Sequence, residues 1–141
     1  MKISRLTTYS PSVLASFDTL MHELSPSSYC DEEKLSAALS DSNSIVLTAV
    51  EDGRIVGTAT LCIAHTPEFT LGFVEAVVVL QEYRGRHIGR MLMNRVIEDA
   101  RHYGVQHLHL TSSPKRSVAN ELYMSLGFQK KETNVYVMNL I

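Results

Sequence analysis

The chain has 141 residues, of which 45% are hydrophobic and 20% charged, and its formal net charge is −2. This length predicts a single domain over residues 1–141, and this hydrophobic content excludes intrinsic disorder. No apolar run reaches the ~18 residues that cross a bilayer, and residues 1–10 lack the apolar stretch of a signal peptide, so no membrane association is expected. The two cysteines, Cys30 and Cys62, form no CxxC pattern, which favours a reduced, cytoplasmic protein.

The first half of the chain predicts two helices followed by a hairpin. Its apolar spacing indicates, in order, a strand over residues 2–8, a helix over 12–24, a helix from an N-cap at Asp31 to about Leu39, and strands over 45–50 and 54–64. The last two strands are joined by Asp52-Gly53, which is a strong signal for a two-residue hairpin turn.

The second half alternates strands and helices. The pattern predicts a strand over 71–80, a helix over 88–103, a strand over 105–111, a helix from Ser113-Pro114 to Leu126, and a final strand over 135–140. Gly104 and Gly127 stand where glycine commonly ends a helix. The predicted order is β-α-α-β-β-β-α-β-α-β, a mixed α/β sheet covered by helices.

Charge is unevenly distributed along the chain. Residues 84–131 hold nine Lys and Arg against three Asp and Glu, a formal charge of +6, and the other residues carry −8. Such a protein can bind a polyanion with one part and a cation with another, although scattered solubilising charge gives the same totals. The overall charge of −2 argues against a general nucleic-acid binder.

The loop of residues 83–90, just before the long helix, has the sequence YRGRHIGR. A loop at a helix N-terminus presents unpaired main-chain amides where the helix dipole favours negative charge, and glycine at 85 and 89 permits close approach of a ligand. A pyrophosphate suits this loop, although a purely structural turn remains an alternative. The G-x-G-x-x-G and P-loop motifs are both absent.

The last helix has a polar face. Arg116, Asn120 and Tyr123 follow helical spacing and share that face, which can direct an amide and a hydroxyl at one ligand. A solvated polar stripe is the alternative interpretation. A second face, with Val118, Leu122 and Leu126, is expected to pack in the core.

These two motifs together resemble the GCN5-related N-acetyltransferase (GNAT) family over roughly residues 44–140, and the order of elements agrees with that family. The resemblance implies acetyl-CoA as co-substrate, no metal, and direct transfer of the acetyl group in a ternary complex to a primary amine of a small molecule or protein. It also implies that residues 23–33 cover the acceptor, with Glu23, Tyr29 and Asp31 as specificity candidates.

The resemblance also implies the residues that bind the cofactor. The CoA pyrophosphate is expected at the loop, and the pantetheine arm is expected to pair with the backbone of the preceding strand. Asn120 is expected to contact the cofactor, and Tyr123 to protonate the departing thiolate. The cofactor-binding residues are therefore Val77, Val78, Val79, Arg84, Gly85, Arg86, His87, Ile88, Gly89, Arg90, Asn120 and Tyr123. His87 stands where the family most often has glycine, but its amide is still available.

Glu75 is the candidate general base. Strand alternation places it with Phe73, Val77 and Val79, and a carboxylate in so apolar a strand is costly unless it is paired, solvated or functional. Relatives often use an acidic residue here, although a structural or substrate-anchoring role is the alternative. An irregularity near Val77 to Val78 is expected to provide a main-chain amide for the oxyanion of the tetrahedral intermediate.

Two other functions compete with the enzyme. One is a non-catalytic acyl-CoA-binding regulatory module, which the presence of both Glu75 and Tyr123 disfavours. The other is a nucleic-acid-binding module that uses the basic segment 84–131. We expect an enzyme with no nucleic-acid or membrane partner and a cationic acceptor that suits the acidic part of the chain. The resemblance leaves a homodimer open, since many proteins that this chain resembles are dimers.

Overall fold

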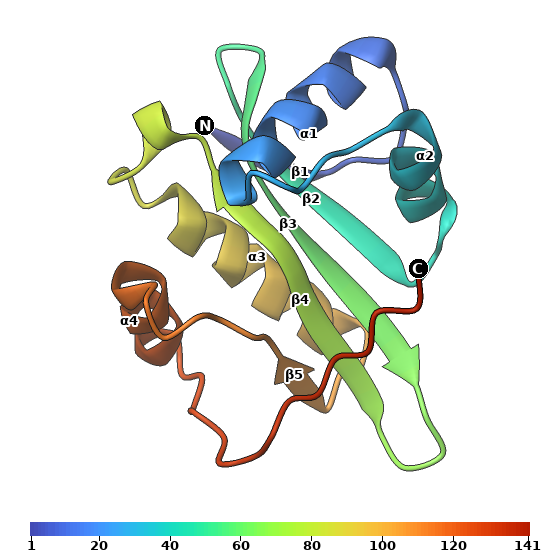
Figure 1. Ribbon diagram of the computed structural model, residues 1–141, viewed down its shortest axis with the longest axis vertical. Helices are drawn as coiled ribbons and strands as arrows, with labels where there is room; N and C mark the ends of the chain where they lie inside the picture. The colour runs from blue at the N-terminus through green and yellow to red at the C-terminus, as the bar shows by residue number, and fades with distance from the viewer. The chain divides into compact units, whose positions relative to one another are not determined.

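The computed structural model describes all residues from 1 to 141, which form two compact units, Met1–Leu110 and Thr111–Ile141 (Figure 1). The first unit contains a five-stranded sheet and three α-helices, and the second contains one α-helix. None of the helices combines the length and the apolar character that crossing a membrane requires.

The elements follow the predicted order up to the last helix. They are β1 (Lys2–Arg5), α1 (Pro11–Leu24), α2 (Glu32–Ser40), β2 (Ser44–Glu51), β3 (Arg54–His65), β4 (Thr70–Val79), the short 3₁₀ helix η1 (Gln81–Tyr83), α3 (Ile88–His102), β5 (His107–His109) and α4 (Ser117–Ser125). The predicted fold class, a mixed α/β sheet with helices, is confirmed.

The predicted N-cap and hairpin signals are also confirmed. The Asp31 carboxylate accepts a hydrogen bond from the Lys34 amide at 2.8 Å, which caps α2. Asp52 and Gly53 both have positive φ, 51° and 76°, as the tight turn between β2 and β3 requires. This turn brings Glu51 and Arg54 opposite each other at the end of the hairpin.

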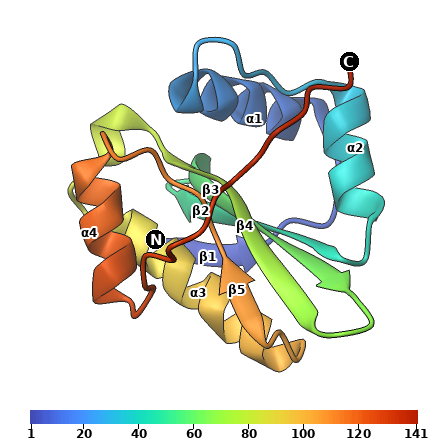
Figure 2. The ribbon, with the colours of Figure 1, turned by 60° about the horizontal axis from the view of Figure 1, so that its bottom comes forward.

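The sheet has the order β1-β2-β3-β4-β5, and only the β4–β5 pair is parallel. Helix α3 covers one face, and α1 and α2 cover the other (Figure 2). Leu92, Met93 and Val96 of α3 are fully buried. Gly57 of β3 allows this close packing, because a Cβ atom there would lie 3.2 Å from Leu92 Cδ1 and 3.3 Å from the Val78 carbonyl oxygen.

Two predictions in the second unit were wrong. Residues 135–140 form no strand, and Tyr136, Val137 and Met138 are at least four-fifths exposed. A β-prone sequence becomes a strand only when a neighbouring chain supplies ladder partners, and no strand pairs with this segment.

The start of α4 and its core face also differ from the prediction. Helix α4 begins at Ser117, because Ser113 and Pro114 belong to a turn in which the Ser113 carbonyl accepts the Arg116 amide at 3.0 Å. Val118, expected in the core, is 81% exposed, whereas Tyr123 of the expected polar face is buried.

Candidate active site

The loop before α3 presents a run of unpaired main-chain amides. Gly85 and His87 both have positive φ, 80° and 62°, and α3 begins at Ile88 immediately after them. None of the amides of residues 85–89 donates a hydrogen bond to another group of the protein. Five successive free donors at a helix N-terminus form an electropositive surface of the kind that binds phosphate groups.

Arg84 and Arg86 of this loop contact neighbouring parts of the first unit. Arg84 Nε donates to the Val79 carbonyl at 3.0 Å, and its Nη2 lies 3.4 Å from Glu23 Oε2. Arg86 Nη1 lies 3.8 Å from Glu51 Oε2, and the Arg86 guanidinium carbon lies 5.0 Å from the centre of the Tyr83 ring. These contacts hold the loop by its side chains and leave its amides open.

Strand β4 has an unpaired edge next to this loop. Its ladder with β5 covers only Leu71 to Phe73, so residues 74–79 have no strand on that side. The Leu80 amide donates a hydrogen bond to the Val56 carbonyl of β3. Because successive residues of a strand direct their amides and carbonyls to opposite sides, the Val78 groups also point toward β3, whereas the Val79 groups point toward the open edge. A ligand along this edge can reach the backbone of Val79 but not that of Val78.

A β-bulge interrupts β4 in the middle of the site. Thr60 lies opposite Glu75 and Thr58 lies opposite Val78, so two residues of β4 stand against Ala59 alone. Ala76, within the bulge, has φ of 52°, a conformation that non-glycine residues rarely adopt. The predicted irregularity is therefore present, next to Val77.

The bulge corrects the predicted face of Glu75. Residues directly opposite each other in a sheet share a face, so Glu75 lies on the face of Thr60, Thr58 and Val78. Val79 lies on the other face, opposite Gly57, and this is the face that α3 covers. The predicted grouping of Glu75 with Val79 was wrong, because the extra residue reverses the alternation.

The Glu75 side chain is exposed and makes no hydrogen bond or ion pair with the protein. Water therefore solvates its carboxylate, and its place in an apolar strand carries no burial penalty. Cys62, which pairs with Phe73 on the same face, is half-buried. Burial is the main cause of the raised pKa of the Cys62 thiol, and the Glu75 carboxylate adds to it.

Tyr123 is the buried polar residue of α4, with 6% of its surface exposed. Its ring packs edge-on against Phe128 at 6.1 Å, and its hydroxyl makes no hydrogen bond within the protein. Burial raises the pKa of the Tyr123 phenol, and the Arg116 guanidinium offsets part of that rise. The phenol is therefore protonated at neutral pH and has a free O–H to donate.

Asn120 lies one turn before Tyr123 in α4. Its Nδ2 donates to the Ser113 carbonyl at 3.0 Å, and this bond holds the turn that precedes the helix. The Asn120 amide thus has a structural partner within its own unit.

The three specificity candidates near the first helices have separate roles. Glu23 pairs with Arg84, Asp31 caps α2, and Tyr29 lies under the ammonium of Lys34, 3.5 Å from the ring centre. Of these, Glu23 alone contacts the loop before α3.

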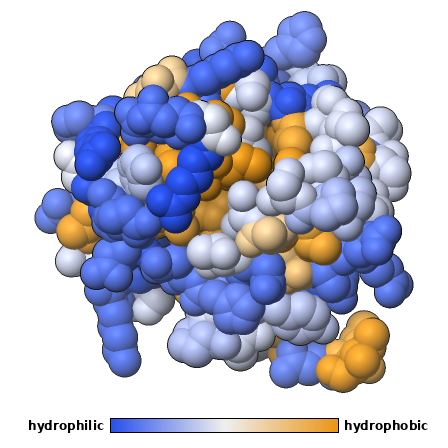
Figure 3. Space-filling model, turned by 90° about the horizontal axis from the view of Figure 1, so that it is seen from above, coloured by the Kyte–Doolittle hydropathy of each residue, from blue (hydrophilic) through white to orange (hydrophobic).

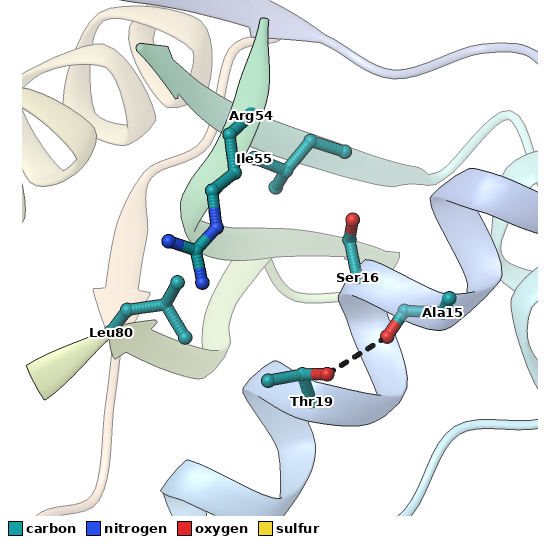
Figure 4. A pocket seen from close by; sticks show the side chains of 6 residues that line it. All are labelled: Ala15, Ser16, Thr19, Arg54, Ile55 and Leu80. Atoms are coloured by element: carbon teal, nitrogen blue, oxygen red, sulfur yellow. Dashed lines mark hydrogen bonds between the residues drawn. The ribbon is translucent and has the colours of Figure 1, made fainter. Parts of the chain in front are cut away.

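A pocket of about 200 Å³ lies between α1 and the hairpin end of the sheet (Figure 4). It is lined by Ala15, Ser16, Thr19, Arg54, Ile55 and Leu80. None of these residues was predicted from the sequence. Arg54 extends over Leu80, the residue that precedes η1 (Figure 4).

The sequence and the fold of this chain are similar to those of known acetyltransferases. The model of the acetyltransferase (GNAT) family matches residues 12–128. Glucosamine 6-phosphate N-acetyltransferase of Trypanosoma brucei brucei is 39% identical over 85 residues, which are 57% of this chain and 54% of that enzyme. Aminoglycoside N(6')-acetyltransferase type 1 of Stenotrophomonas maltophilia is 29% identical over 110 residues, 74% of this chain and 72% of that enzyme.

A putative acetyltransferase from Agrobacterium tumefaciens has a similar solved structure, with a TM-score of 0.86 and 25% identity, covering 99% of this chain and 100% of that chain. The unpaired edge of β4 and the open amides before α3 thus occur in a chain whose sequence and fold both match acetyltransferases. The chain belongs to the acetyltransferase (GNAT) family. The class predicted from the two sequence motifs is confirmed.

Proposed function

We propose that this protein transfers the acetyl group of acetyl-CoA directly to a primary amine within a ternary complex. The observation that carries the proposal is the run of five free amides at residues 85–89, next to the unpaired edge of β4, in a chain of the GNAT family. The amides bind the pyrophosphate of CoA, and the Val79 amide, whose carbonyl already accepts from Arg84, donates to the pantetheine arm at the open edge. No covalent intermediate with the enzyme is required.

The acceptor amine must lose a proton before it attacks. An alkyl amine with a pKa of ~10.4 is almost wholly protonated at pH 7, so a base or a water chain has to remove that proton. Glu75 is our candidate, because its carboxylate is exposed, free of other partners, and next to the bulge on the face opposite α3. The role does not depend on an unusual environment: a solvated carboxylate next to the acceptor can pass the proton on to water.

The bulge provides the next group. The extra residue in a bulge lies outside the ladder, so an amide at Ala76 or Val77 is available to stabilise the oxyanion of the tetrahedral intermediate. When the intermediate collapses, the C–S bond breaks and the CoA thiolate takes a proton. Tyr123 is our candidate donor, since its phenol is protonated at neutral pH and its O–H is free. This role requires the Tyr123 hydroxyl to reach the sulfur.

The acceptor is proposed to be a small, cationic amine. Support comes from the formal charge of −8 outside residues 84–131 and from the relatives, which are named for amino sugars and aminoglycosides. We further propose that the two units act together as one N-acetyltransferase domain, because the family match runs through both, and that the enzyme is cytoplasmic.

Two measurements test this function. Calorimetry with CoA should give binding that is lost in Gly89→Val, because we expect a branched side chain at this position to keep a pyrophosphate away from the main-chain amides. A panel of amines, including amino sugars, aminoglycosides and polyamines, should identify an acceptor through thiol release from acetyl-CoA. CoA binding with no turnover on any amine would support the acyl-CoA-binding regulatory module instead, and no CoA binding at all would reject the proposal.

A further inference from the structure

The β2–β3 hairpin ends in a pair of opposite charges close to the loop before α3. Glu51 and Arg54 are cross-strand partners on either side of the Asp52-Gly53 turn. Figure 1 shows the hairpin beside η1, and Figure 3 views the molecule from this end, where hydrophilic side chains surround an apolar patch. A two-residue turn leaves the backbone little freedom, so the Cβ positions of Glu51 and Arg54 are well defined.

Glu51 and Arg54 pair with the segment before α3 and not with each other. Arg54 Nη2 lies 3.3 Å from Glu82 Oε1, and Arg86 Nη1 lies 3.8 Å from Glu51 Oε2. The guanidinium carbons of Arg54 and Arg86 also lie 5.7 and 5.0 Å from the centre of the Tyr83 ring. The result is a row of alternating charges, Glu82, Arg54, Glu51 and Arg86, whose two arginines both lie against the Tyr83 ring.

The Glu51 end of this row depends on Arg86. Glu51 Oε2 is buried and accepts no hydrogen bond, so the Arg86 guanidinium at 3.8 Å compensates its negative charge. A buried carboxylate oxygen without a hydrogen bond is costly when its counter-charge is removed. The charge of Glu51 therefore stabilises the position of the Arg86 guanidinium beside the hairpin.

We infer that Arg86 is a positioning residue, which ties the loop to the hairpin through Glu51 and so holds the amides of residues 85–89 in their open arrangement. The family resemblance implies that Arg86 contacts the cofactor directly. Its guanidinium instead has an acidic partner and an aromatic ring on the hairpin side. The effect on CoA rests on the proposed function, whereas the effect on the loop itself does not.

The two possible roles of Arg86, binding phosphate directly or positioning the loop, predict opposite changes in CoA affinity when Glu51 is replaced by Gln. If Arg86 binds phosphate directly, Glu51→Gln frees the guanidinium and makes the surroundings less negative, so CoA binds more tightly. If Arg86 positions the loop, the same change loosens the loop and weakens CoA binding. An ion pair of this exposure contributes up to ~1 kcal/mol, which corresponds to about a fivefold change in Kd.

The experiment compares Glu51→Gln, Arg86→Gln, the double variant, and the exchanged pair Glu51→Arg with Arg86→Glu. Glu68→Gln, in the β3–β4 loop, is the matched loss of one exposed carboxylate. We expect the two single variants to raise the Kd for CoA and the KM for acetyl-CoA about fivefold with kcat unchanged. The double variant should be no worse than either, and the exchanged pair should recover most of the loss.

Tryptic cleavage after Arg84, which all variants retain, reports the order of the loop without CoA. It should be faster in the single variants and return toward the parent rate in the exchanged pair. The inference is overturned if Glu51→Gln tightens CoA binding or leaves it unchanged while Arg86→Gln weakens it, or if cleavage is unaffected. A parent protein that does not bind CoA would reject the proposed function alone, because cleavage still tests the link between loop and hairpin.

Discussion

Arg84 Nε donates a hydrogen bond to the carbonyl oxygen of Val79, 3.0 Å away, and this bond closes the corner between β4 and the loop before α3. Val79 faces the open edge of β4, so its carbonyl has no strand to accept from. The bond satisfies that carbonyl and sets the direction in which the loop leaves the sheet. The end of β4 and the first amides of the loop are thus held as one unit by a side chain.

Tyr123→Phe tests the proposed acid. The ring and its packing against Phe128 are retained, and only the O–H is lost. We expect kcat to fall about 100-fold or more, as is usual for loss of a general acid, while the Kd for CoA changes less than twofold. Steady-state kinetics and calorimetry check this, and Tyr136→Phe, at an exposed phenol, is the matched control. Equal rates in Tyr123→Phe and parent would remove this role.

Glu75→Gln tests the proposed base. The Gln amide has nearly the same shape as the carboxylate but cannot act as a base. The ascending limb of kcat/KM against pH should therefore flatten in the variant. Because the Glu75 side chain is exposed and unpaired, the thermal midpoint should stay within about 2 °C of the parent. An ascending limb that persists in the variant would leave Glu75 as a substrate anchor or a structural residue.

His87→Gly tests the backbone of the loop. His87 has φ of 62°, which costs a non-glycine residue about 1 kcal/mol, and its side chain is exposed. The glycine variant should therefore be as stable as the parent or up to about 1 kcal/mol more stable in urea unfolding, with CoA affinity retained because the amide remains. His87→Ala keeps the strain and serves as the control; a glycine variant less stable than the alanine variant would contradict this account.

Alkaline pH should weaken the fold. Burial raises the pKa of the Cys62 thiol and of the Tyr123 phenol in the folded protein. As pH rises, both groups therefore lose their protons at a lower pH in the unfolded chain than in the folded one, which favours unfolding. Their contribution to the free energy of unfolding is complete below the pKa values of the unfolded chain, 9.0 for Cys62 and 10.0 for Tyr123. It is lost as pH rises through the higher pKa values of the folded protein. Urea unfolding at pH 7.5 and at pH 10 measures the loss.

The matched variant for this effect is Cys62→Ala. It removes one of the groups whose pKa is raised, so its unfolding free energy should fall less between the two pH values than that of the parent. The same decrease in both proteins would show that the thiol has no part in the pH dependence.

Much of the fold could be predicted because its signals are local. The cap at Asp31, the Asp52-Gly53 turn and the glycine after α3 each depend on the chemistry of a few adjacent residues. The loop of residues 83–90 was found for the same reason, since glycines before an amphipathic helix mark its position without any distant contact. Glu75 and Tyr123 were found through the family resemblance, which gave them roles that remain proposals.

The features that were not predicted depend on which chains lie side by side. The extra residue in the bulge at Ala76 moves Val79 to the face opposite Glu75. The alternation of residues within one strand cannot predict this, because the bulge depends on how the strand pairs with its neighbour. The segment 135–140 has the composition of a strand but no neighbour to complete a ladder. The pairing of Glu51 with Arg86 joins residues far apart in the chain, where neither has a distinctive local pattern.

The amino-acid sequence by itself determined the order of the elements up to the last helix, the position of the loop before α3 and the family, because these follow from residues that are neighbours along the chain. Tertiary structure alone decided the face on which Glu75 lies, the edge to which Val79 is directed and the partners that hold Arg84 and Arg86. The physical reason is that hydrogen-bond register and charge pairing are set by distances across the sheet, which only the folded chain brings within a few ångströms.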